Sequence, residues 1–75
     1  MDKTTQRMKI IEYCKKHGSI TIRDAFIKLN INSPSKRISE IRNSDKYVVN
    51  SIDESKTDED GTITRWKRYY INEMR

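Results

Sequence analysis

The stretch GSITIRDAFIKLNINSPSKRISEIR, residues 18–42, contains two helix starts separated by the length of one short helix. Thr21 followed by Asp24 has the spacing of a capping box, in which each side chain accepts a hydrogen bond from the other residue's backbone N–H. Ser33 and Pro34 place an N-cap residue and a favoured first-turn residue at the second start. The stretch therefore predicts two short helices joined by a tight turn.

Apolar residues at helical spacing extend this prediction to three helices, over about 5–17, 22–29 and 34–43. The recurring residues are Met8, Ile10, Ile11 and Cys14, then Ile22, Ala25, Phe26 and Leu29 facing inward, then Pro34, Ile38 and Ile41 facing the core. Gly18 has the position of a helix stop. Ile31 is expected to plug the turn before the third helix, where Asn30 tolerates unusual backbone angles.

Residues favoured in strands follow the third helix and predict a hairpin over about 47–71. They are Tyr47, Val48, Val49, Ile52, Ile63, Trp66, Tyr69, Tyr70 and Ile71. A polar loop, 53–61, ending in the turn dipeptide Asp60-Gly61, separates the two strands. Alternation along the strands predicts two faces. The face that covers the helices is expected to carry Tyr47, Val49, Tyr69 and Ile71. The opposite face is expected to carry Trp66, Arg68 and Tyr70. The link 19–21 is strand-like, could pair with the hairpin, and is expected to bury Ile20.

Size and charge narrow the classes of protein. The chain has 75 residues and is expected to form a single domain over 1–75. A chain this short buries only about 60% of its unfolded surface, which leaves little room for a catalytic pocket. Sixteen Lys and Arg against eleven Asp and Glu leave a net charge of +5, which suits a polyanionic partner such as nucleic acid.

The predicted order of elements resembles a small winged helix-turn-helix domain of the kind found in bacteriophage and mobile-element regulators. The residues that carry the resemblance are Ile10, Ile11 and Cys14, HGSIT at 17–21, Ala25, Leu29 and Ile31, SPSKRISEIR at 33–42, and RYYI at 68–71. The implied fold class is mainly α with a β-hairpin (α+β), three helices followed by a two-stranded wing. The implied function is sequence-specific binding of double-stranded DNA, with the third helix in the major groove, by a transcriptional repressor or an excisionase-like factor that bends DNA.

The third helix carries the candidate DNA-binding residues. A helical wheel places Lys36, Ser39, Glu40 and Asn43 opposite the core, with Arg37 and Arg42 on the flanks. A solvated polar face is the simpler interpretation of periodicity alone, whereas the position in a helix-turn-helix favours DNA contact. The resemblance implies base contacts from Lys36, Ser39 and Asn43 and phosphate contacts from Ser33, Ser35, Arg37 and Arg42.

Two residues of this helix have alternatives. The stem of Arg37 could cover the core while its guanidinium pairs with an acid such as Asp24. Glu40 is repelled by phosphate, but it could accept a hydrogen bond from a cytosine amino group or pair with Lys36.

The predicted wing departs from the family pattern because its tip is acidic. Residues 47–61 hold one cation and five anions. Phosphate contacts are therefore expected from the base of the wing, through Arg65, Lys67 and Arg68. The acidic loop also motivates a second hypothesis, a protein-interaction or inhibitor module on the same scaffold. Trp66 and Tyr70 are candidate exposed aromatic residues for such a module, and an apolar hairpin face could equally form a homodimer.

An enzymatic function is not favoured, and no catalytic residue, cofactor or metal ligand set is predicted. His17 and Cys14 are the only histidine and cysteine, and no metal-ligand spacing, phosphate loop or nucleophile motif is present. Cys14 is expected to be a core side chain and His17 to favour the helix end. A lone cysteine and the absence of a leader or of a run of about 20 apolar residues favour a cytoplasmic protein, in a prokaryotic cell or a phage-infected host, without a membrane span.

Overall fold

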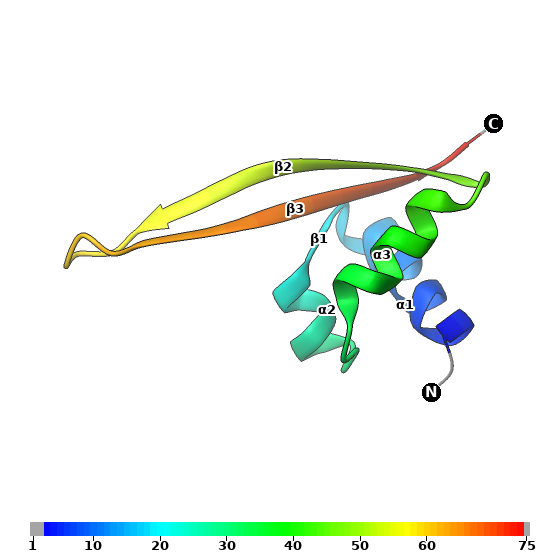
Figure 1. Cartoon of the computed structure of the whole chain (residues 1–75), viewed down its shortest axis with the longest axis horizontal. Coiled ribbons are helices and arrows are strands. Elements are labelled where there is room, and N and C mark those ends of the chain that lie inside the picture. Colours follow the sequence, from blue (N-terminus) through cyan, green and yellow to red (C-terminus); the bar gives the residue numbers. More distant parts are fainter. Residues whose placement is uncertain (1–2, 75) are drawn as a thin grey trace.

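The computed structural model describes residues 3–74, and residues 1–2 and 75, which the predicted domain includes, lie outside the described part. The elements are α1 (Lys3–His17), β1 (Ile20–Thr21), α2 (Ile22–Lys28), α3 (Pro34–Asn43), β2 (Tyr47–Thr57) and β3 (Ile63–Glu73). The three helices gather beside one half of a long hairpin, whose tip projects beyond them (Figure 1). The predicted fold class, three helices followed by a two-stranded wing, is confirmed.

The two helix starts differ in how they are held. At α2 the Thr21 hydroxyl accepts a hydrogen bond from Asp24 N (3.1 Å), while Thr21 N donates to the Asp24 carboxylate (3.2 Å), which confirms the capping box. At α3 the Ser33 side chain makes no capping hydrogen bond, and Pro34 begins the helix. Because proline supplies a helical φ and has no N–H to satisfy, α3 starts without a side-chain cap.

The turn that joins α2 to α3 has the geometry expected from its residues. Asn30 has a φ of 56°, in the left-handed region that asparagine tolerates. The amide of Ile31 donates to the carbonyl of Ala25 (3.1 Å), and the Ile31 side chain is fully buried. Gly18, with a φ of 90°, ends α1 and donates to the Cys14 carbonyl (2.7 Å). The contacts of Asn30 and Ile31 hold the tight turn that precedes α3.

The core is small and consists mostly of isoleucine. Its buried members are Ile10, Ile11, Cys14, Ile20, Ala25, Ile31, Ile38, Ile41 and Ile71. The prediction that Phe26 faces inward is wrong, since 55% of it is exposed. At about 100° per residue Phe26 lies about 100° from Ala25, at the edge of the apolar arc of α2. Met8 lies at the edge of the α1 arc for the same reason and is also exposed.

The hairpin joins the short link after α1 to form a three-stranded antiparallel sheet in the order β1-β3-β2. Ile20 pairs with Tyr69, and the β2–β3 register runs from Tyr47 opposite Glu73 to Thr57 opposite Ile63. The predicted loop 53–61 is too long, because β2 continues to Thr57. Two strands in solvent can complete their backbone hydrogen bonds with each other without apolar side chains. The polar composition of residues 53–57 therefore placed the end of the first strand too early.

The faces of the hairpin match the predicted alternation near the helices. Ile71 is buried, and Tyr47, Val49 and Tyr69 pack partly buried against the core. Residues 55–65 are all exposed. The sheet therefore supports the helical cluster with one half of its length only.

Candidate nucleic-acid interface

The outer side of α3 is a continuous polar and cationic surface. Its exposed residues are Ser35, Lys36, Ser39, Arg42 and Asn43, and Ser33 is exposed just before the helix. Lys36, Ser39 and Asn43 follow one another at intervals of three and four residues, which puts them on one face. Lys36 and Arg42 form no ion pair within residues 3–74. The structure thus leaves these cations available to a ligand.

Arg37 lies on the other side of α3, and its predicted exposed position at a phosphate is wrong. Only 4% of the residue is exposed. Its Nη2 lies 3.1 Å from Glu40 Oε2, one turn along the helix, and its buried Nε has no hydrogen-bond partner in the described structure. The alternative that the stem covers the core is confirmed, but the partner is Glu40 rather than Asp24.

Glu40 connects α3 to α1. Besides Arg37, its carboxylate accepts a hydrogen bond from Arg7 Nη1 at 2.7 Å. The residue is half-buried, so the helical wheel was wrong to place it opposite the core, and no ion pair with Lys36 forms. Two guanidinium groups neutralise this carboxylate, so that it does not oppose a polyanion at the outer face of α3.

The predicted cations of the wing fall into two groups. Arg65 and Lys67 are exposed. Arg68 instead donates from Nε to Glu54 Oε1 (2.8 Å) and from Nη1 to Ser19 Oγ (3.1 Å), which ties β3 to β2 and to the link before β1. Its charge is therefore partly satisfied within the chain.

The same carboxylate oxygen of Glu54 also accepts from Trp66 Nε1 at 2.8 Å. The hydrogen bonds from Arg68 and then from Trp66 hold the pKa of Glu54 below its usual value, because they favour the charged form. The indole, the guanidinium and the carboxylate together fix one patch of the hairpin surface.

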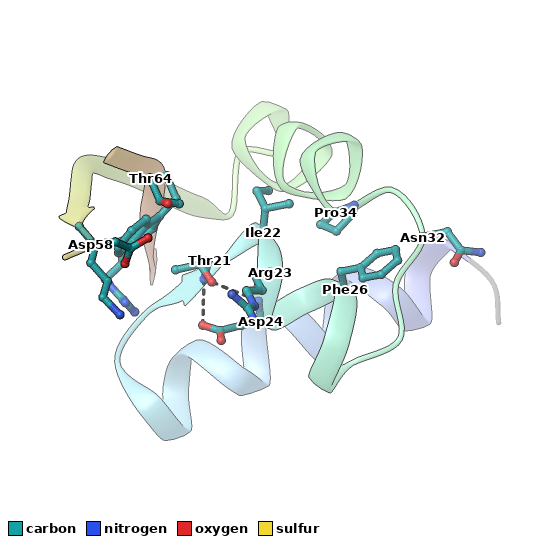
Figure 2. A pocket seen from close by; sticks show the side chains of 12 residues that line it. Thr21, Ile22, Arg23, Asp24, Phe26, Asn32, Pro34, Asp58 and Thr64 are labelled. Carbon is teal, nitrogen blue, oxygen red and sulfur yellow. Dashed lines mark hydrogen bonds between the residues drawn. The ribbon is translucent and has the colours of Figure 1, made fainter. Parts of the chain in front are cut away.

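A groove of about 870 Å³ separates the hairpin from α2 and the beginning of α3. Figure 2 shows Asp58 and Thr64 of the hairpin on one side and Phe26 and Pro34 on the other, with the Thr21–Asp24 capping box between them. Two exposed cations, Arg23 of α2 and Lys56 of β2, also line the groove and were not predicted as site residues. They are 33 positions apart, and only the fold brings them to one groove.

The wing tip is an acidic turn formed by 58–62. Asp58 N donates to Thr62 O (2.8 Å), and Asp60 Oδ1 accepts from Thr62 N (3.0 Å). This backbone N–H lowers the pKa of Asp60, because the hydrogen bond favours the charged form of the carboxylate. The tip thus combines three acidic residues with no cation, which disfavours contact with phosphate.

Three helices with a tight turn before the third, followed by a hairpin that pairs with a short strand, define a winged helix-turn-helix. A family model described as winged helix-turn-helix domain matches residues 5–74, and the chain therefore belongs to this family. Searches of curated proteins and of solved structures gave no match. Domains of this family are in general DNA-binding and typically non-enzymatic. None of the described helices is both long and apolar enough to span a membrane.

Proposed function

We propose that the chain is a sequence-specific regulator that binds double-stranded DNA with α3 in the major groove. The observation that carries this proposal is the outer side of α3, where exposed cations without a partner in the described chain accompany short polar side chains. In this assignment Lys36, Ser39 and Asn43 contact base edges. Ser33, Ser35 and Arg42 contact phosphates on either side of these bases. Arg37 is not assigned to DNA, because it is buried.

The hairpin and α2 would add contacts to the backbone beside the major groove. Arg65 and Lys67 are exposed on β3, and Arg23 and Lys56 line the groove between α2 and the hairpin. These four cations suit phosphates, which do not require a fixed geometry. Arg68 would instead support the site by keeping β3 in register with its neighbours.

The biological role that fits best is a small prokaryotic or bacteriophage regulator acting in the cytoplasm, either a transcriptional repressor or an excisionase-like factor of a mobile element. The support for this finer assignment is the resemblance of its motif residues to those of such regulators. A neighbouring integrase gene would favour the excision factor.

A protein-interaction module is the second candidate function. The observation that favours it is the pair of exposed apolar residues on α2, Phe26 and Ile27, together with the acidic tip at 58–60. Exposed apolar residues beside charged ones are common in protein interfaces. In this alternative the chain would bind a basic protein partner or a second copy of itself without reading a DNA sequence.

Selection of binding sites from a random duplex pool, followed by anisotropy titration at near-physiological salt, distinguishes the two candidates. A regulator should enrich a motif and bind it at least about a thousandfold more tightly than scrambled DNA. Weak, salt-sensitive binding without enrichment would contradict the proposal and favour a protein partner. Symmetry in the motif would indicate a dimer.

Single substitutions then test the assignment of α3. Arg42→Ala should reduce the slope of log affinity against log salt by about one unit, since one phosphate contact by a cation is lost. Lys15→Ala is the matched control, because it removes an exposed cation on α1 that is paired with Glu73. Asn43→Ala should relax base preference by about 1–3 kcal/mol. Equal losses on all sequences would exclude base reading by Asn43.

A further inference from the structure

A basic hollow lies on the surface formed by α1 and α2. It has a volume of about 360 Å³ and is lined by Lys9, Glu12, Tyr13, Lys16, His17, Lys28 and Leu29. We call it the α1–α2 hollow. Lys9 and Lys16 are exposed and form no ion pair within residues 3–74, although Glu12 lies between them in the sequence. Three ammonium groups against one carboxylate make this surface positive.

One of these ammonium groups is held in position by aromatic contacts. Lys28 Nζ donates to the Tyr13 hydroxyl (3.3 Å) and lies 5.9 Å from the centre of the Tyr13 ring. The Tyr13 ring packs in turn on His17, with ring centroids 4.3 Å apart. These contacts restrict Lys28 before any ligand binds, which lowers the entropic cost of binding an anion there.

The acidic tip at 58–60 is the complementary surface of the same chain. Its three carboxylates form no ion pair with any described cation. The tip lies at the far end of the hairpin, beyond the helices (Figure 1), and the molecule is 43 Å along its longest axis against 28 and 21 Å along the others. A tip in this position is accessible to another molecule.

We propose that the acidic tip of one copy docks on the α1–α2 hollow of a second copy. Three carboxylates meet three ammonium groups, and neither set has an ion-pair partner in its own described chain. The two surfaces differ, so the contact is heterologous and can repeat along a row of molecules. Neither surface includes the outer side of α3, so copies in such a row would each keep that helix free. Such a row would let copies occupy neighbouring DNA sites cooperatively, a consequence that rests on the proposed function. The contact between copies does not itself require DNA.

Sedimentation velocity without DNA tests the contact. The full chain should self-associate at about 20 mM salt and dissociate at about 500 mM, where charges separated by more than about 4 Å are screened. Asp58→Asn with Glu59→Gln should weaken self-association about tenfold or more, as should Lys9→Gln with Lys16→Gln. These pairs leave Asp60, which holds the turn, and Lys28 unchanged. Lys15→Gln is the control for loss of a cation and should have no effect.

Charge reversal provides the decisive comparison. A tip-reversed chain carries Asp58→Lys and Glu59→Lys, and a hollow-reversed chain carries Lys9→Glu and Lys16→Glu. Each alone should be monomeric at low salt with an unchanged circular dichroism spectrum. An equimolar mixture should associate again, because each tip then meets a hollow of opposite charge.

A wild-type chain that stays monomeric at low salt, or a mixture that stays monomeric, would overturn the proposal. Loss of affinity for a single-site duplex in the Lys9→Gln, Lys16→Gln variant with self-association unchanged would identify the hollow as a DNA contact and also overturn it. Failure of sequence selection leaves the sedimentation measurements unaffected, because they contain no DNA.

Discussion

Replacing Glu40 by Gln should destabilise the protein, because this carboxylate balances a buried guanidinium. Arg37 is 4% exposed, and the only ion pair it forms in the described structure is with Glu40 at 3.1 Å. Glutamine keeps the size of the side chain and one oxygen acceptor but removes the charge. The guanidinium then remains in the interior without a counter-ion, next to an Nε that already has no partner.

The magnitude follows from the two ion pairs that the substitution breaks. Removing one partner of a buried pair costs about 3–5 kcal/mol. Arg7 and Glu40 are each about one-third exposed, so water screens their pair, which contributes less than about 1 kcal/mol. We therefore expect a loss near the lower limit, about 3 kcal/mol, which corresponds to a fall in Tm on the order of 12–24 °C for a domain of this size.

Urea unfolding followed by circular dichroism measures this loss. The double variant Glu40→Gln, Arg37→Met removes the buried charge along with its partner, and it should recover at least half of the lost stability. A loss below about 1 kcal/mol in the single variant would refute the reasoning. So would a double variant no more stable than Glu40→Gln, since the cost would then not arise from an unpaired charge.

Three further predictions concern the capping box, the hairpin and the core cysteine. Thr21→Ala removes the hydroxyl that caps α2 and should cost about 1 kcal/mol in urea unfolding, whereas Thr21→Ser should cost less. Because its hydrogen bonds lower the folded pKa of Glu54, this residue contributes to stability above the ordinary carboxyl pKa near 4.3 and loses that contribution as pH falls through the folded pKa. The acid dependence of the free energy of unfolding should therefore lack this component in Glu54→Gln. Burial raises the pKa of the Cys14 thiol to about 11, so a thiol reagent at pH 8 should modify it slowly in the native chain and rapidly in urea; equal rates would contradict its burial.

The fold was predictable because its signals are local. A capping box is read over four residues, and the turn before α3 is read from Asn30 and Ile31. The apolar positions of α1 and α3 repeat at helical spacing, and alternation in the hairpin identified Tyr69 and Ile71 as core-facing. Each of these patterns depends on neighbours within one element, which the sequence displays directly.

The site was less predictable because its features depend on residues distant in the sequence. Arg7 and Glu40 are 33 positions apart, and no spacing rule indicates that α1 supplies the partner of an acid on α3. A wheel treats Arg37 as a flanking cation and does not show that its stem reaches the core. Arg23 and Lys56 lie at one groove for the same reason, through the packing of two elements.

The unsupported half of the hairpin makes the length of the wing adjustable. Residues 55–65 pack against nothing that excludes water, so residues can be added or removed there without changing the core. Adding two residues to each strand would move the tip about 7 Å outward and keep every side chain on its present face. Adding one residue to each strand would move it about half as far and exchange the two faces beyond that point. An even number of residues added to each strand therefore changes only how far the wing reaches, whereas an odd number also exchanges its faces, and the helical body stays the same in both cases.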